Sequence, residues 1–138
     1  MRVADIMQTG VVSVELDDRL GHVQRLFQQR GFHHLLVVEE GRLFGILSDR
    51  DLLGVLTPTL GTVAESARDR AVLNRRVHQI MTRQPHAVTP QCSVMAAVDL
   101  MLEHGFSCIP VVDTDQKPVG VVTWRDLLRA YRQACPND

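Results

Sequence analysis

The chain contains two copies of one pattern, and this internal repeat constrains the fold more than any other feature of the sequence. When the sequence is shifted by 74 residues, Gly31 falls on Gly105 and the apolar residues around them also match. One residue inserted near Asp115 changes the shift to 75 for the rest of the match. Such a match indicates two structural repeats, each too small to bury its apolar surface alone. The repeats span residues 1–56 and 77–134, with a linker over 57–76.

Each repeat predicts the same order of elements, β-α-β-β-α. Apolar residues three or four positions apart follow the first strand, and this spacing gives a helix one apolar face. Gly31 and Gly105 come directly after these helices, where a left-handed residue commonly ends a helix. We expect strands at 11–14, 35–38 and 43–47, and at 86–88, 109–112 and 119–122, with the last helices beginning at Ser48 and Thr123.

The fold class that follows is α/β, with the two β-α-β-β-α repeats packed about a pseudo-twofold axis so that they share a core. The linker opens with a Thr57-Pro58-Thr59 loop. It then predicts a helix, because Thr62 and Glu65 have the spacing of a capping box and alanines follow. The arginines of the linker, at positions 68, 70, 75 and 76, are expected to form a solvated face rather than a binding patch.

Composition narrows the class of protein. A formal net charge of −1 offers no excess of positive charge for nucleic acid, so any anion must be held by local groups. The three cysteines are odd in number and widely spaced, which indicates neither a disulfide framework nor a metal or redox motif. No two of the six histidines are four residues apart, so we expect no helical metal site. The sequence starts without an apolar signal segment and has no run long enough to span a membrane, which indicates a cytoplasmic protein.

The candidate chemistry lies in the string Gly-x-x-[Ser/Thr]-x-Arg-Asp, which opens the last helix of both repeats. Its two copies end in Ser48-Asp49-Arg50-Asp51 and Thr123-Trp124-Arg125-Asp126. One interpretation is a capping box, in which the hydroxyl and the carboxylate satisfy free backbone donors of the helix. The other is a nucleotide site, because a helix N-terminus suits phosphate and a carboxylate one turn further on can accept from two ribose hydroxyls. The recurrence of the string at equivalent places favours the second interpretation.

This string resembles the motifs of the CBS-domain family, as do Asp5-Ile6-Met7, Gln79-Ile80-Met81-Thr82 and the segment 105–112. The tandem pair is similar to a Bateman module, and the resemblance covers nearly the whole chain outside the linker. It implies an adenosine-containing ligand (AMP, ADP, ATP or S-adenosylmethionine) with the final Asp on the ribose, the Ser or Thr near the phosphate, and strand backbone around the adenine. The arginine of each string is expected either on phosphate or in solvent. The nucleotide-binding residues implied are Gln8, Val12, Ser13, His33, His34, Ser48, Arg50 and Asp51 at a first site, and Thr82, His86, Ala87, Ser107, Cys108, Thr123, Arg125 and Asp126 at a second.

The resemblance further implies a stand-alone regulatory module that is not an enzyme and that passes ligand occupancy to a protein target by a change in packing. The sequence itself contains no evident activated nucleophile and no paired general acid and base. The alternative is a structural dimerisation module with vestigial ligand sites. A homodimer is expected because Leu52-Leu53 and Leu127-Leu128 supply more apolar residues than one buried helix face needs. Pro110 fixes a backbone that borders the base, so we expect the second site to be the tighter one.

Overall fold

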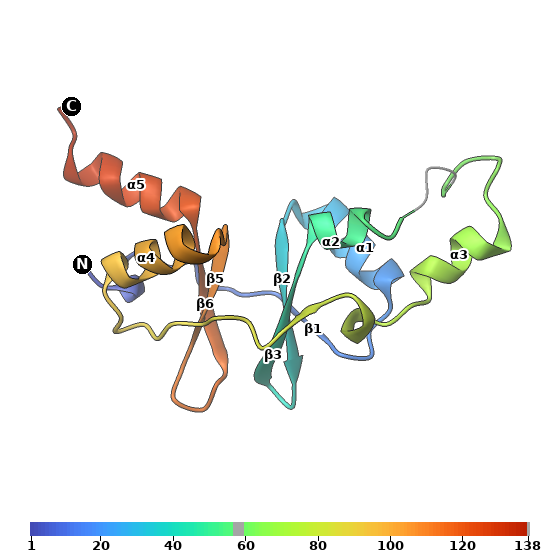
Figure 1. The fold of residues 1–138 in the computed structure, drawn as a ribbon, viewed down its shortest axis with the longest axis horizontal. Coiled ribbons are helices and arrows are strands. Elements are labelled where there is room, and N and C mark those ends of the chain that lie inside the picture. Colours follow the sequence, from blue (N-terminus) through green and yellow to red (C-terminus); the bar gives the residue numbers. More distant parts are fainter. Residues whose placement is uncertain (57–59, 138) are drawn as a thin grey trace. The chain divides into compact units, whose positions relative to one another are not determined.

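The computed structural model describes residues 1–56 and 60–137, which form two compact units. Unit 1 comprises Met1–Val11, Gly41–Leu43 and Pro85–Asp138, and unit 2 comprises Val12–Glu40 and Phe44–Gln84. Each unit has its own cluster of buried apolar side chains. Figure 1 labels the helices and strands of both units. The expected loop over 57–59 lies outside the described residues.

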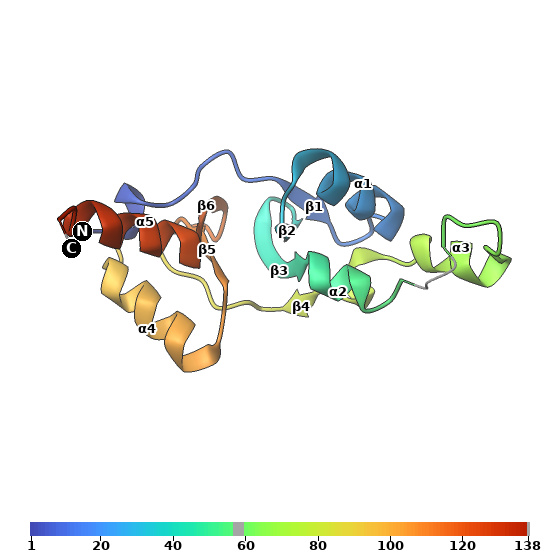
Figure 2. The same ribbon diagram turned by 90° about the horizontal axis from the view of Figure 1, so that it is seen from above.

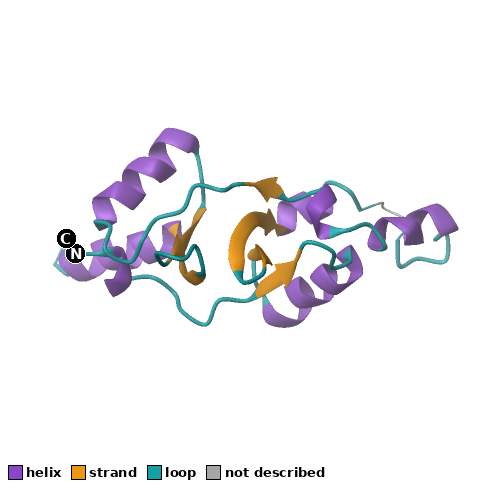
Figure 3. Ribbon diagram, turned by 90° about the horizontal axis from the view of Figure 1, so that it is seen from below, coloured by secondary structure: helices purple, strands orange, loops and turns teal. Residues whose placement is uncertain are grey.

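Unit 2 is built on a four-stranded sheet in the order β1-β2-β3-β4. The outer strands β1 and β4 are short, and they flank the longer pair β2 and β3 (Figure 3). Val14, Val37 and Leu47 from the sheet form the core with Leu20, Val23 and Leu52 from the helices α1 and α2. The bounds are β1 (Ser13–Glu15), α1 (Leu20–Arg30), β2 (His34–Glu39), β3 (Arg42–Ser48), α2 (Asp49–Leu53) and β4 (Thr82–Arg83).

Unit 1 repeats this strand order with a shorter sheet. Strand β5 (Cys108–Val112) pairs antiparallel with β6 (Pro118–Thr123), and Val88 bridges β5 in parallel while Gln8 bridges β6 on the other side. The strand expected at 86–88 is therefore reduced to a single bridge. Helices α4 (Val94–His104) and α5 (Trp124–Ala134) pack against each other beside the hairpin (Figure 2).

Both long first helices end as the sequence predicts. Gly31 ends α1 with φ of 68°, and Gly105 ends α4 with φ of 72°. The amide of each glycine donates to a carbonyl of the last helical turn, from Phe27 in α1 and from Met101 in α4. The prediction that the final helices begin at the Ser and Thr of the repeated string is also confirmed, since Ser48 and Thr123 are the N-caps of α2 and α5.

The linker helix begins later than the sequence analysis placed it. Helix α3 (Ala67–Leu73) has Ser66 as its N-cap, and the capping box joins Ser66 to Asp69. The Asp69 amide donates to Ser66 Oγ over 3.2 Å, and the Asp69 carboxylate accepts from the Ser66 amide over 3.0 Å. The predicted capping box from position 62 to position 65 is therefore wrong.

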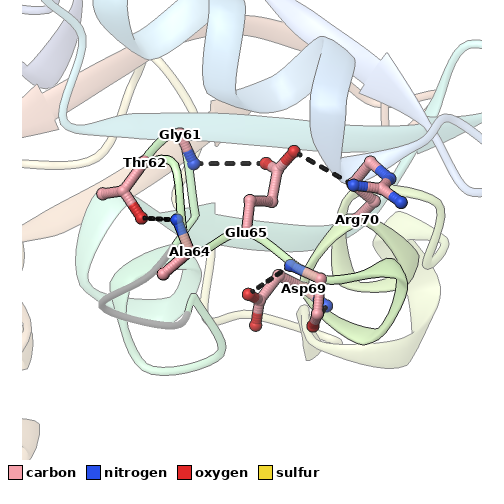
Figure 4. Close-up of polar contacts among 7 residues, drawn as sticks. Gly61, Thr62, Ala64, Glu65, Asp69 and Arg70 are labelled. Carbon is pink, nitrogen blue, oxygen red and sulfur yellow. Dashed lines mark hydrogen bonds and ion pairs between the residues drawn. The ribbon is translucent and has the colours of Figure 1, made fainter.

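The polar groups before α3 are engaged in a turn instead. The Glu65 carboxylate accepts from the amide of Gly61 over 3.1 Å and pairs with Arg70 over 3.5 Å (Figure 4). The hydroxyl of Thr62 accepts from the Ala64 amide, only two residues on, which is the usual local turn of a Thr side chain. Neither side chain is left to cap a helix, so the helix starts at the next suitable pair.

Each unit takes its first segment from the other sequence repeat. The 3₁₀ helix Val3–Asp5 and the residues after it belong to unit 1, where Val3 is fully buried and its amide donates to Cys92 O over 2.8 Å. The 3₁₀ helix Val77–Gln79 belongs to unit 2, where Val77 is buried and its amide donates to Asp18 O over 2.9 Å. The compact units therefore differ from the linear repeats by this exchange.

Candidate nucleotide-binding sites

The carboxylate of Asp51 is held at the start of α2 by the Ser48 backbone. The Ser48 amide donates to Asp51 Oδ2 over 2.9 Å, and the Asp51 amide donates to Ser48 Oγ over 3.0 Å. Asp51 is partly exposed. Its second carboxylate oxygen accepts no hydrogen bond from any residue that the structure describes. The capping interpretation and the ribose interpretation are thus compatible here, because capping occupies one oxygen and the other is not bonded by the part of the chain that the structure describes.

The carboxylate of Asp126 occupies the equivalent place at the start of α5 but is surrounded by donors. The amide and hydroxyl of Thr123 donate to Oδ2 over 2.8 and 3.1 Å. Gln8 Nε2 lies 3.0 Å from Oδ1 and 3.3 Å from Oδ2, and Arg129 Nη1 lies 2.9 Å from Oδ1. Asp126 is only 3% exposed. Both of its oxygens are therefore already hydrogen-bonded within the protein.

The first amide of each of these helices already donates a hydrogen bond to a backbone carbonyl. The Asp49 amide donates to His33 O over 2.9 Å, and the Trp124 amide donates to Ser107 O over 3.3 Å. In α2 the Asp51 amide is also taken, by Ser48. The helix N-termini consequently offer fewer free donors to a phosphate than the sequence analysis assumed.

The remaining candidates of unit 2 lie around β1, β2 and β4. His33 Nδ1 is 2.9 Å from Asp49 Oδ2, and both side chains are well exposed. Burial lowers the pKa of the neighbouring His34, although the carboxylates of Asp49 and Asp51 oppose the shift. The structure places the other candidates as follows: Val12 is half-buried before β1, Ser13 starts β1, Thr82 starts β4 opposite Ile46, and Arg50 is exposed in α2.

The remaining candidates of unit 1 are largely engaged with other side chains. The His86 ring stacks on His104 with 4.5 Å between centroids, at the end of α4. The Arg125 guanidinium lies 5.1 Å from the centroid of the Trp124 ring. Burial, with a smaller effect from the Asp126 charge, raises the pKa of the Cys108 thiol to about 12. Ala87 precedes the Val88 bridge to β5.

Two residues change places relative to the sequence analysis. Gln8 was grouped with Asp51, but its side chain lies on Asp126. Thr82 was grouped with Asp126, but it pairs with β3 in the unit that holds Asp51. The cause is the exchange of first segments described above.

Arg129 is a contact that the sequence analysis missed. It stands three residues after Asp126 on α5 and forms an ion pair with it. The signal was available, because side chains three apart on a helix are neighbours and an Asp–Arg pair at that spacing is favourable.

Two further findings concern metal sites and membrane spans. The described residues contain no group of three or more His, Cys, Asp and Glu side chains that could hold a metal ion. None of their helices is both long and apolar enough to cross a bilayer.

The comparisons with known proteins agree with this architecture. The model of the CBS domain matches residues 3–58 and 77–133. An uncharacterized protein of Methanocaldococcus jannaschii is 30% identical over 132 residues, which cover 94% of this chain and 44% of that protein. A CBS domain-containing protein of Dictyostelium discoideum is 30% identical, over 91% of this chain and 88% of its own length. The crystal structure of CBSX2 in complex with AMP is 26% identical, with a TM-score of 0.79 and coverage of 96% and 97% of the two chains.

The two β-α-β-β-α repeats and their matched strings define a tandem CBS pair, and the chain belongs to the CBS-domain family. It spans less than half the length of the archaeal relative, so that protein contains further segments.

Proposed function

We propose that the chain is a regulatory CBS pair that binds an adenosine-containing ligand and signals by a change in packing. The observation that carries this proposal is the Asp51 carboxylate, in which the Ser48 amide fixes one oxygen and no described residue donates to the other. The same string recurs in the other unit, and a relative that this chain matches over nearly its full length was solved with AMP. The ligands to be tested are AMP, ADP, ATP and S-adenosylmethionine.

In the proposed complex the ribose diol donates to the Asp51 carboxylate. A carboxylate accepts such bonds with charge assistance, so the pair is worth about 1.5–3 kcal/mol, or roughly ten-fold or more in affinity. Capping keeps the carboxylate in place before the ligand arrives, which reduces the ordering cost of binding. A 2′-deoxy ligand lacks one of the two donors and should bind more weakly.

The proposal assigns no catalytic step to the chain. Among the candidate site residues, Cys108 carries a thiol, which is a common type of catalytic nucleophile, and the pKa of this thiol is shifted. That shift, to about 12, keeps the thiol protonated near neutral pH, and a protonated thiol is a poor nucleophile. All three cysteines are free, which suits a reducing compartment such as the cytoplasm.

We also propose that the module acts as a homodimer. Trp124, Leu128 and Tyr131 follow one another at i, i+4 and i+7 on α5, and each is at least 48% exposed. A helix face of this kind is a usual site of association. Leu53 in α2 is exposed as well, whereas its neighbour Leu52 is buried.

Calorimetric titration of the full chain with the four ligands tests the proposed binding. Asp51→Ala should weaken binding by about ten-fold or more. Asp69→Ala is the matched control, because it removes the carboxylate of an equivalent capping box in the linker. Equal weakening by both variants would reduce Asp51 to a structural role. If none of the four ligands binds the wild-type chain, the alternative of a dimerisation module with vestigial sites stands instead.

A further inference from the structure

The two carboxylates of the repeated string are in different hydrogen-bonding states. An ionised carboxylate offers about four acceptor positions on its two oxygens. At Asp126, donors from Thr123, Gln8 and Arg129 occupy both oxygens. At Asp51 the corresponding described contact is the Ser48 amide alone. A ribose diol needs two acceptor positions. At Asp51 the described residues leave such positions unoccupied, whereas at Asp126 they are taken.

The sequence explains this difference residue by residue. The shift of 75 that matches Asp51 to Asp126 also matches Gly54 to Arg129, so the ion-pairing side chain exists in one repeat only. The shift of 74 matches Gln8 to Thr82, whose side chain is too short to make the same reach. The bond from the Thr123 amide to Asp126, in contrast, has a counterpart in the bond from the Ser48 amide to Asp51. It is part of the N-terminal cap in both α5 and α2.

Gln8 and Arg129 are also the donors that can leave. The Arg129 side chain is 66% exposed while that of Asp126 is 2% exposed, so the guanidinium can exchange its partner for water. Gln8 is exposed too, and its backbone is fixed independently by the bridge to Val121. Its amide can therefore swing away from Asp126 without breaking the sheet.

We propose that Gln8 and Arg129 form a latch that closes the Asp126 carboxylate to ligand until their side chains move aside. Asp51 then takes the first equivalent of the adenosine ligand, and Asp126 takes a second only at higher concentration. This inference rests on the proposed function, because it concerns the same class of ligand. It reverses the order of affinity expected from Pro110.

AMP titrations of four full-length chains test the latch. They are wild type, Asp51→Asn, and Asp51→Asn combined with either Arg129→Ala or Arg132→Ala. Asp51→Asn silences the open site while keeping an oxygen acceptor at the cap. Arg132 is the matched control, since it lies one turn further along α5 and contacts the carbonyls of Cys135 and Pro136 instead of Asp126.

The latch predicts that Arg129→Ala strengthens AMP binding in the Asp51→Asn background by about three- to ten-fold, because binding no longer breaks the ion pair between the buried Asp126 carboxylate and the exposed Arg129 guanidinium. Arg132→Ala should leave the affinity unchanged. Unchanged or weaker binding after Arg129→Ala would overturn the latch and make Arg129 a residue that orients Asp126 for the ligand.

A ligand-free measurement separates failure of the latch from failure of the proposed function. The Arg129→Ala and Asp126→Asn substitutions should have non-additive effects on the urea midpoint, because they share one contact. Non-additivity without binding of AMP, ADP, ATP or S-adenosylmethionine by any chain would reject the proposed function while the contact itself exists. AMP binding with fully additive effects would reject the latch alone.

Discussion

The glycine of the repeated string should be intolerant of a single added methyl group. A Cβ on Gly120 would lie 2.8 Å from Gln8 O and 2.9 Å from Met7 Sδ. Both distances are shorter than the non-bonded contacts that Cβ atoms make in folded proteins, and the Gln8 oxygen belongs to the backbone. Gly120→Ala therefore forces the segment around Gln8 away from β6.

The magnitude follows from what that movement breaks. Gln8 and Val121 exchange two backbone hydrogen bonds, of 2.8 and 3.0 Å. Losing both costs about 1–3 kcal/mol, overpacking costs about 1–3 kcal/mol, and the lower entropy of the unfolded alanine chain returns about 0.4–1 kcal/mol. The net destabilisation is about 1–6 kcal/mol, with a central value of about 3 kcal/mol. Gly45→Ala should act in the same way in unit 2, where its Cβ would lie 2.9 Å from Thr82 O and 2.6 Å from Met81 Sδ.

Urea denaturation monitored by tryptophan fluorescence measures the effect in unit 1, because Trp124 is the only tryptophan of the chain. Gly54→Ala is the control. Gly54 has φ of −64°, and its added Cβ would lie 3.5 Å from the nearest atoms, so alanine should be neutral or stabilise by up to about 1 kcal/mol. A Gly120→Ala midpoint equal to that of the wild type would refute the reasoning. So would a Gly54→Ala protein that is destabilised to the same extent.

Three further predictions concern the thiols, pH and assembly. Cys92 should react first with a thiol reagent at about pH 8, because hydrogen bonding from Thr89 lowers the pKa of its thiol. Cys108 should react last, because burial raises the pKa of its thiol to about 12. Peptide mass mapping measures the order of reaction, and Thr89→Ala should slow the reaction of Cys92. The pKa of His34 is lowered in the folded chain, so on acidification the unfolded chain binds a proton before the folded chain does. The free energy of unfolding should therefore fall as the pH drops below about 6.5, by at most about 1.4 kcal/mol per pH unit. A His34→Gln protein whose urea midpoint has the same pH dependence as the wild type would contradict this. Sedimentation at micromolar concentration should give a dimer that Leu128→Asp shifts toward monomer, and a wild-type chain sedimenting at 15.5 kDa would be inconsistent with the proposed interface.

Local rules were sufficient to predict most of the elements from the sequence. The glycines that end α1 and α4 and the Ser and Thr that begin α2 and α5 depend on backbone geometry within one turn, which residue type largely decides. The start of α3 was misplaced because two capping pairs, 62/65 and 66/69, compete within eight residues. Which pair wins depends on contacts of Glu65 with Gly61 and Arg70 that residue spacing does not reveal.

The grouping of site residues could not be obtained from the repeat in the same way. An alignment of two repeats is symmetric, so it shows that Gln8 and Thr82 are equivalent but not which repeat each one packs against. Only the pairing of Gln8 with Val121 and of Thr82 with Ile46 decides that. The resulting contact between Gln8 and Asp126 joins residues from opposite ends of the sequence.

Because of the exchanged segments, the two units cannot form at the same time during synthesis. Unit 2 ends at Gln84, whereas unit 1 needs Met1–Val11 together with the last strands and helices of the chain. At about 5–20 residues per second, translation from the end of unit 2 to the end of α5 takes roughly 3–10 s. Until the later strands of unit 1 have been made, Val3, which is fully buried in the finished protein, lacks part of the core in which it packs, because that core includes Ile109 and Val122. Residues 1–11 are thus made before unit 2 but fold after it, and we expect a nascent chain stalled before β6 to carry a folded unit 2 beside an exposed apolar segment.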